Sequence, residues 1–418
     1  MSIQKKNSIH GILGWFTASL FYAFHNCIIA ALTLNPQELM SSLAINNTQF
    51  GLISVFYTIG YAAMQIPVGV LLDHFSLKKL VVMATLVFGL GCFILSTTDS
   101  YMLILVIRLT MGAAAAFAVL AAFKISAEWF DPEYFATLAG LTVSLGYLGS
   151  IIGNKFVYLF QYYSLASIFF YLGIAGALVT AFSFFFINNF TPAEGKALKV
   201  DGIIDDLKAI SCNKKSIVLI VYAMLIFTPL QVFKDSLGPS FFQSYYQYSA
   251  QDAAFIMNVM LFATIVTAPL LGLISDKMGK RKPIIVYTPY ILLGCFAAIF
   301  ARIDLLIPNL SFLINCMLFA IFGSIVWGFL LSYSVFKETH DTHIVSTGLG
   351  LMQTLNMLGG ILAVPMITSV IDLLSQPTYG LTSEQIYFYA FMIIPIFVLL
   401  ALPLLKHIPE TNCKQQYD

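Results

Sequence analysis

Arg108 is the side chain in this sequence best suited to bind a charged solute. It lies within a long apolar segment, and a guanidinium stays charged at every physiological pH. An ionised side chain in such surroundings costs about 2.5–3.5 kcal/mol on membrane-insertion scales. It therefore needs water, a carboxylate, backbone carbonyls or an anionic solute as its partner. Binding a substrate carboxylate and bonding to the backbone of a neighbouring helix are both compatible with the sequence.

His25 is the side chain best suited to accept a proton within the apolar segments. All 20 Asp and Glu residues fall in polar connections or at segment ends, although proton-carrying sites in membranes commonly use a buried carboxylate. His25 lies beside Asn26 and one helical turn from Tyr22, and imidazole titrates near neutral pH. The structural alternative is a histidine satisfied by packing and one hydrogen bond.

Asp235 is a second candidate for proton binding. It follows Pro229 and Gln231 at the end of an apolar segment. A break in the helix at this point would turn the carboxylate inward, toward a cavity. The alternative is an external residue that pairs with Lys234.

Neutral polar side chains supply the other candidates for contact with a solute. Tyr57, Tyr61 and Gln65 follow i, i+4, i+8 spacing and share one helix face, which would either line a cavity or join two helices. One arginine with amides and aromatic rings suits a small solute that has a carboxylate and an apolar body. The predicted contact residues are Tyr22, His25, Asn26, Tyr57, Tyr61, Arg108, Gln231, Trp327, Gln353 and Asn356.

Lys124 follows Arg108 by 16 residues in the same apolar segment. Because each helical residue turns the direction by about 100°, the two cations face nearly opposite sides of the helix and cannot hold one solute together. Lys124 lies near the end of the segment, where its chain could extend to the membrane surface.

The elements that must position these residues are membrane-spanning helices. The chain is 59% hydrophobic and only 10% charged, with a mean hydropathy of +0.87, whereas soluble domains are about a quarter charged. Its apolar runs are long enough to cross a bilayer as helices and too unalternating for barrel strands. The predicted spans, numbered 1 to 12, are 11–33, 50–72, 80–98, 102–127, 137–160, 166–187, 216–234, 253–274, 283–301, 310–333, 346–371 and 386–405.

The distribution of Lys and Arg predicts the orientation of these spans. Sixteen of the 21 lie in the two tails and the even-numbered connections, and only Lys234 and Arg302 lie on the opposite side. The positive-inside rule therefore places both termini in the cytoplasm, which we expect to be that of a bacterium with this protein in its inner (plasma) membrane. The long polar connection 188–215 predicts a six-helix bundle over 1–187, a cytoplasmic loop, and a second bundle over 216–418.

A short pattern recurs after spans 2 and 8, at a constant offset. Gly69, Asp73, Lys78 and Lys79 superpose on Gly272, Asp276, Arg281 and Lys282. Glycine lets two helices approach closely, and a carboxylate followed by basic residues would form a charge latch between helix ends. A plain positive-inside loop would need neither the glycine nor the aspartate. The predicted latch comprises Gly69, Asp73, Lys78, Lys79, Gly272, Asp276, Gly279, Lys280 and Arg281.

This arrangement resembles the major facilitator superfamily over the whole chain. The family's hallmark is a G-x-x-x-D-[RK]-x-G-[RK]-[RK] connection between spans 2 and 3, with a weaker copy between spans 8 and 9. Here the second copy is the fuller one, because the first has His74, Ser76 and Leu77 at three of its positions. The resemblance implies two pseudo-symmetric six-helix bundles rocking about a central site, in an all-α membrane protein.

A finer resemblance links the chain to bacterial metabolite-uptake carriers, including the phagosomal group that takes up amino acids. It rests on the segments 129–132 and 238–242. We therefore expect secondary, proton-coupled uptake of an amino acid or a small carboxylate-bearing metabolite by alternating access. Efflux of drugs or a siderophore is the alternative, and the absence of a Gly-Pro pair in span 5 counts against it. A non-transporting receptor and a membrane enzyme are alternatives of another class.

Other kinds of chemistry find little support in the sequence. Its six Cys residues are scattered, with no C-x-x-C pair, which argues against disulfides and a structural metal site. Only the connection between spans 10 and 11 gathers His with acidic residues, in an order that lacks the i, i+4 His pair of zinc hydrolases. We expect a monomer in the lipid bilayer with a small-molecule substrate, and no cofactor, metal, nucleic-acid partner or catalytic residue.

Overall fold

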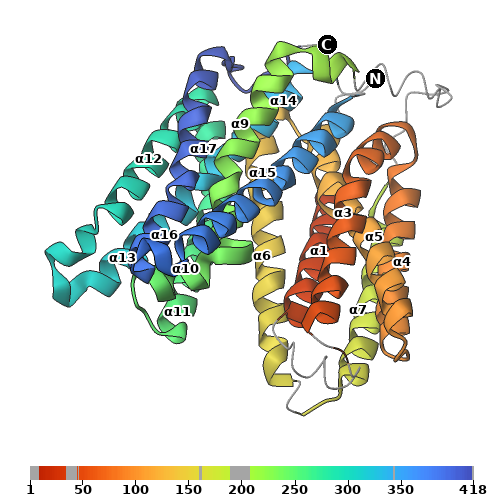
Figure 1. Ribbon diagram of the computed structural model, residues 1–418. Coiled ribbons are helices and arrows are strands. Elements are labelled where there is room, and N and C mark those ends of the chain that lie inside the picture. Colours follow the sequence, from red (N-terminus) through yellow and green to blue (C-terminus); the bar gives the residue numbers. More distant parts are fainter. Residues whose placement is uncertain are drawn as a thin grey trace. The chain divides into compact units, whose positions relative to one another are not determined.

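Within the part of the chain that the structure describes, twelve helices are long and apolar enough to cross a bilayer. The computed structural model describes residues 9–33, 45, 47–159, 162–188, 208–341 and 344–416, and every regular element in those ranges is helical (Figure 1). Each of the predicted spans overlaps one of the twelve helices. The prediction of an all-α membrane protein with twelve spans is therefore confirmed.

The chain forms two compact units. The first comprises Met1–Ala209 with His340–Thr354, and the second comprises Ile210–Thr339 with Leu355–Asp418. Residues 189–207 of the predicted central loop lie outside the described residues. The segment His340–Thr354, which lies in the second half of the sequence, belongs by its contacts to the first unit. The predicted division into two halves joined by a loop stays a prediction.

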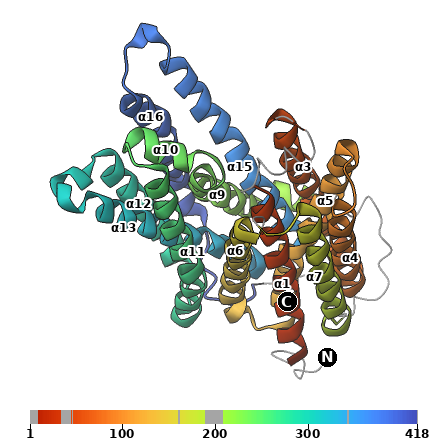
Figure 2. The same cartoon turned by 90° about the horizontal axis from the view of Figure 1, so that it is seen from below.

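The first unit holds the helices of spans 1 to 6. Three pairs of helices pack along each other: α1 with α6, α3 with α5, and α4 with α7 (Figure 2). Serine side chains accept hydrogen bonds from the first turns of α4 and α7, which fixes where those helices begin. The elements are α1 (Ile9–Thr33), α3 (Asn47–His74), α4 (Leu77–Leu95), α5 (Tyr101–Trp129), η2 (Pro132–Tyr134), α6 (Phe135–Leu159) and α7 (Leu165–Phe186).

Two glycines let α3 and α5 pack so closely that their backbones are in contact. A Cβ atom added to Gly112 would lie 2.1 Å from the carbonyl oxygen of Tyr57, and one added to Gly60 would lie 2.1 Å from that of Leu109. Because those neighbours are backbone atoms, neither helix can yield without moving as a whole. This close approach places Arg108, one turn before Gly112, against α3.

Gly112→Ala is expected to lower the free energy of unfolding by about 1–3 kcal/mol, because the methyl group overpacks a backbone contact. Thermal unfolding in detergent would measure the loss. Gly294→Ala in α12 (Lys282–Phe300) is the matched control, since nothing lies within 4 Å of its added Cβ. Equal melting temperatures for the two variants would contradict the proposed contact between α3 and α5.

The second unit holds the helices of spans 7 to 10 and 12, with most of span 11. α11 packs along α13, and α17 packs against α9 and α12. The elements are α9 (Lys214–Gln231), η3 (Val232–Leu237), α10 (Gly238–Tyr245), α11 (Ala250–Met278), α12, η4 (Ile303–Leu306), η5 (Pro308–Leu310), α13 (Ser311–Ile325), η6 (Val326–Phe329), α14 (Leu330–Thr339), α15 (Val345–Leu374), η7 (Pro377–Tyr379), α16 (Ser383–Phe391), α17 (Ile393–Ala401) and η8 (Leu402–His407).

Spans 7 and 10 are interrupted helices. In span 7, α9 runs through Pro229 and passes into the π-helical turn η3, which continues into α10, so the helix changes form after Pro229 rather than breaking there. The backbone of Asp235 lies in η3, but its side chain is outside the described part of the structure. In span 10 the 3₁₀ turn η6 separates α13 from α14 and carries Trp327. Such interruptions often mark hinges or binding sites.

Candidate functional site

Arg108 packs against α3, and one of its nitrogens has no hydrogen-bond partner among the described residues. Its side chain is buried, with 2% of the residue exposed. Its Nε donates a long hydrogen bond of 3.4 Å to the carbonyl oxygen of Ile53, and its guanidinium carbon lies 4.3 Å from the ring centroid of Tyr57. Nη1 is buried and has no hydrogen-bond partner among the residues that the structure describes. The arrangement orients a guanidinium and leaves a donor for an anion.

His25 joins this arginine through the tyrosine between them. Its Nδ1 lies 2.8 Å from the hydroxyl oxygen of Tyr57, and its Nε2 lies 3.1 Å from Nδ2 of Asn26. The Asn26 amide also donates to the carbonyl oxygen of Tyr22 at 2.8 Å, so Nδ2 is a donor and Nε2 of His25 must accept. The imidazole is therefore neutral with its hydrogen on Nδ1, and a second proton must displace the Asn26 amide.

Aromatic stacking completes this group in the first unit. The Tyr61 ring stacks on His25 with centroids 5.8 Å apart and on Tyr57 with centroids 6.4 Å apart. The face of α3 predicted from the i, i+4, i+8 spacing thus contacts His25 and Arg108. Gln65 continues that face, fully buried, and neither its Oε1 nor its Nε2 has a partner within the described ranges. Buried amides without partners are rare in native structures.

The second unit holds a separate set of predicted contact residues. Trp327 packs against Phe227 and Phe329, with ring centroids 6.0 and 5.4 Å apart. Asn356 donates through Nδ2 to the hydroxyl of Tyr333 at 2.7 Å, and its Oδ1 has no partner among described residues. These side chains form an aromatic wall with one amide acceptor.

Two predicted contact residues have other surroundings. Oε1 of Gln231 accepts a hydrogen bond of 3.1 Å from the backbone N–H of Gly360, so this amide joins α9 to α15. Gln353 is half-buried and lies in the first turns of α15, which belong to the first unit.

The first copy of the repeated pattern forms a buried ion-pair cluster. Asp73, at the end of α3, pairs with Lys124 at 2.8 Å and accepts hydrogen bonds from the backbone N–H and the hydroxyl of Thr347 at 2.8 and 2.9 Å. Lys124 also pairs with Glu128 at 3.1 Å. Lys124 therefore turns into the protein rather than extending to the membrane surface. A Cβ on Gly69 would lie 2.5 Å from the carbonyl oxygen of Ser346, so this glycine permits the approach of α15.

The basic residues of the first connection lie elsewhere. Nζ of Lys78 is 4.8 Å from the ring centroid of Phe184, and Lys79 is exposed. The sequence superposes Lys78 on Arg281, but the cation that neutralises Asp73 comes from α5. The signal that could have found it is Lys124 followed by Glu128 one turn later, at the end of a span.

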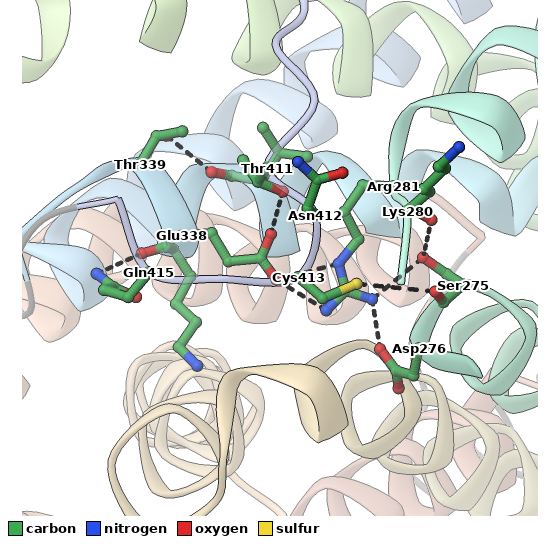
Figure 3. Close-up of polar contacts among 12 residues, drawn as sticks. Ser275, Asp276, Lys280, Arg281, Glu338, Thr339, Thr411, Asn412, Cys413 and Gln415 are labelled. Carbon is green, nitrogen blue, oxygen red and sulfur yellow. Dashed lines mark hydrogen bonds and ion pairs between the residues drawn. The ribbon is translucent and has the colours of Figure 1, made fainter. Parts of the chain in front are cut away.

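The second copy forms a cluster around Arg281, whose side chain is fully buried (Figure 3). Its Nε and Nη2 donate to one oxygen of Glu338 at 3.0 and 2.7 Å, and its Nη1 pairs with Asp276 and donates to Ser275 Oγ at 3.1 Å. Burial alone would lower the pKa of Arg281, but Glu338 and Asp276 outweigh it and raise that pKa. The cation is therefore firmly held in its charged form.

Local structure explains how the second connection brings Arg281 inward. Gly279 ends α11 in the left-handed conformation at φ 62°, which an L side chain rarely adopts. Ser275 Oγ donates to the carbonyl oxygen of Lys280 at 2.9 Å, which closes the turn. Lys280 itself is exposed and Gly272 is buried within α11.

Each of the two clusters also contains a glutamate that is not part of the repeated pattern. Glu128 is the last residue but one of α5, and Glu338 is the last residue but one of α14. Each faces the cation that neutralises the aspartate of its unit. In the sequence, Glu338 falls in the connection after predicted span 10 (310–333), but the structure places it at the buried end of the last helix of that span, α14.

Comparison with known proteins settles the family. The family model described as Major Facilitator Superfamily matches residues 14–364 of the chain. The chain belongs to this superfamily. Of the solved structures, the MFS transporter FucP in the outward conformation aligns with a TM-score of 0.68 at 16% identity, covering 94% of this chain and 98% of that one. The superfamily consists of transporters rather than enzymes, so this chain is a multi-pass membrane transporter with twelve spans.

Curated relatives match at low identity. The Uncharacterized transporter YybO of Bacillus subtilis (strain 168) is 27% identical over 30% of this chain and 29% of its own. The "Probable sulfoacetate transporter SauU" of Cupriavidus necator is 24% identical over 36% of this chain and 34% of its own. The matched stretch thus spans about a third of these two relatives. The Hexuronate transporter of Bacillus subtilis is 21% identical over 82% of this chain and 84% of its own.

Proposed function

We propose that this transporter is a secondary carrier for a small organic solute bearing a carboxylate, either an amino acid or a similar metabolite. The observation that carries the proposal is Arg108: a buried guanidinium, oriented by Tyr57 and Ile53, whose Nη1 lacks a partner among the described residues. Leaving such a donor unsatisfied is costly, and a substrate carboxylate would satisfy it. One cation suits one carboxylate better than a multiply charged anion.

The names of two relatives support an anionic substrate. One is called a hexuronate transporter and the other a sulfoacetate transporter, and both words denote organic acids. Within the second unit, Trp327, Phe227 and Phe329 form an apolar surface that would suit an organic solute. We also propose that the solute is contacted by Tyr22, Tyr57, Tyr61, Asn26, Gln231, Gln353 and Asn356.

Proton coupling and uptake form part of this proposal. His25 contacts Tyr57, which in turn lies under Arg108, so proton binding at His25 would change the support of the guanidinium. Asp235 in η3 is the second coupling candidate. The distribution of Lys and Arg favours a bacterial inner membrane with both termini in the cytoplasm, and protease accessibility of tags at the two ends would test that orientation.

Uptake into proteoliposomes tests the substrate class. Radiolabelled amino acids, sugar acids and small monocarboxylates would be offered with and without an inwardly directed proton gradient. We expect accumulation of at least one carboxylate-bearing solute and a larger accumulation with the gradient. No accumulation of any member of the panel, by protein that retains a sharp melting transition, would overturn the substrate claim. Accumulation that ignores the gradient would overturn only the coupling.

We further propose that the two ion-pair clusters act as latches that hold the outward-open state of the carrier. Asp73 contacts both α5, through Lys124, and α15, through Thr347. Asp276 has the equivalent place beside Arg281. A latch stabilises one state without touching the substrate, so its loss shifts the populations of states.

Asp73→Asn is expected to slow transport about tenfold, because an amide can still accept from Thr347 but no longer pairs with the charge of Lys124. That factor corresponds to about 1.4 kcal/mol in the balance between states. Uptake rates and ligand-induced thermal shifts, measured on the same protein, would separate transport from binding. An unchanged transport rate, or a loss of binding that equals the loss of transport, would contradict the latch.

A further inference from the structure

The C-terminal segment 408–416, here called the strap, is docked onto the second unit. It follows η8 and lies against the C-terminal end of α11, the N-terminal end of α12 and the C-terminal end of α14 (Figure 3). Three of its side chains are buried, those of Ile408, Thr411 and Cys413, while Asn412 and Lys414 are exposed.

Glu410 of the strap caps α12. Its two carboxylate oxygens accept hydrogen bonds of 2.9 Å from the backbone N–H groups of Arg281 and Lys282. The first N–H groups of a helix have no partner within the helix and attract an anion. Partial burial would raise the pKa of Glu410, but these N–H groups, with those of Thr411 and Asn412, lower it. The carboxylate is thus built into the start of α12 as an anion.

Thr411 and the residues after it close the end of α14. The hydroxyl of Thr411 donates to the second oxygen of Glu338, the carboxylate whose first oxygen holds Arg281. The backbone N–H of Gln416 donates to the carbonyl oxygen of Glu338 at 2.7 Å. Nε2 of Gln415 donates to the carbonyl oxygen of Lys337 at 3.2 Å. The strap therefore satisfies carbonyls that the last turn of α14 leaves free.

The backbone of the strap also indicates specific docking. Asn412 and Cys413 are consecutive residues in the left-handed region, at φ 51° and 57°. Non-glycine residues rarely adopt this conformation, and they keep it only where surrounding contacts determine it. Sγ of Cys413 lies 3.7 Å from the carbonyl oxygen of Ser275, which adds α11 to those contacts.

We propose that the strap is a detachable intramolecular ligand of the cradle formed by the ends of α11, α12 and α14, and that its docking limits the movement of α14. α14 is a helix of 10 residues, joined to the rest of span 10 through η6. Because η6 offers a flexible point, the end of α14 can move more readily once Glu338 and Lys337 lose the strap, although Arg281 still pairs with Glu338. The effect on transport rate rests on the proposed carrier function, whereas the docking does not.

Hydrogen–deuterium exchange of the full-length protein tests the docking. Glu410→Gln and Thr411→Val each remove strap contacts while keeping the chain intact, and we expect exchange in the last turn of α14 to rise at least tenfold in each. Lys414→Ala is the matched control, because that side chain is exposed in the same strap, and it should leave exchange unchanged. Exchange in α14 that stays at the wild-type rate in both contact variants would overturn the proposal.

A peptide added in trans gives a second, independent measurement. Ending the chain at His407 should raise exchange in α14, and a synthetic peptide of residues 408–418 should restore protection. The same peptide with Glu410→Gln and Thr411→Val should not. Equal protection by both peptides, or by neither, would show that the cradle does not recognise the strap.

Transport distinguishes this proposal from the substrate claim. Releasing the strap should speed uptake about threefold with an unchanged KM, since α14 moves more freely and the site residues are untouched. Hydrogen–deuterium exchange is measured without a substrate. The docking of the strap is therefore tested independently of whether any carboxylate is transported. Faster exchange in α14 without any change in uptake would confine the strap to a structural role and overturn its effect on the transport rate.

Discussion

Arg108→Gln is expected to reduce uptake of the carboxylate substrate about a hundredfold. Removing one partner of a buried, hydrogen-bonded charge pair costs about 2–5 kcal/mol, and a factor of ten corresponds to about 1.4 kcal/mol. The loss should fall mainly on binding, because Nη1 of Arg108 is the unsatisfied donor that a carboxylate would occupy. A ligand-induced rise in melting temperature, present in wild type and absent in the variant, would measure it.

Arg108→Lys is the more discriminating variant. Lysine keeps the charge but lacks the planar fork, so it cannot stack on Tyr57 and donate sideways to Ile53 at once. We expect about a tenfold loss, intermediate between wild type and Arg108→Gln. Lys406→Gln removes one exposed positive charge and should leave uptake unchanged. Full uptake by Arg108→Lys would show that the guanidinium geometry is not used, and full uptake by Arg108→Gln would remove the arginine from the site.

Tyr57 allows the two roles around Arg108 to be separated. Its ring supports the guanidinium and its hydroxyl contacts His25. Tyr57→Phe retains the ring and should preserve binding while weakening the response to a proton gradient. Tyr57→Leu removes both the ring and the hydroxyl, so it should weaken substrate binding as well as the response to a proton gradient.

Much of this architecture is readable from the sequence, because a bilayer imposes length and polarity on every span. All twelve spans and their order follow from apolar runs alone. The shared face of Tyr57 and Tyr61 follows from helical spacing, and the cost of an isolated charge singles out Arg108. These inferences depend on properties of single helices, and such properties are local in the chain.

Contacts between helices are less visible in the sequence. Lys124 reads as a residue near a membrane surface, yet it meets Asp73 because Gly60 and Gly112 draw α3 against α5. Glu338 reads as part of a connection because the apolar run of span 10 stops several residues before the helix does. The strap has no apolar run and no repeat. Its place depends on unpaired N–H and C=O groups at helix ends that only the fold brings together.

Arg281→Met is expected to lower the free energy of unfolding by about 3–5 kcal/mol, the cost of leaving buried charges without their partner. The variant would strand Asp276 and Glu338, whose side chains are 6% and 0% exposed. The thermal or denaturant-induced unfolding of the purified protein in detergent would measure the loss. Lys277→Met is the matched control, since it removes an exposed cation from the same connection and should change stability by less than about 0.5 kcal/mol.

Neutralising Asp276 and Glu338 as well tests whether unpaired charge causes the loss of stability in Arg281→Met. In the triple variant Asp276→Asn, Glu338→Gln, Arg281→Met, neither carboxylate is left as a buried charge without its arginine, so most of the lost stability should return. Thr411 can still donate to the amide oxygen of the new glutamine, so the strap should stay docked. If the triple variant is no more stable than Arg281→Met, the arginine acts by filling space rather than by pairing charges. In that case the resemblance between the two ion-pair clusters reflects packing alone.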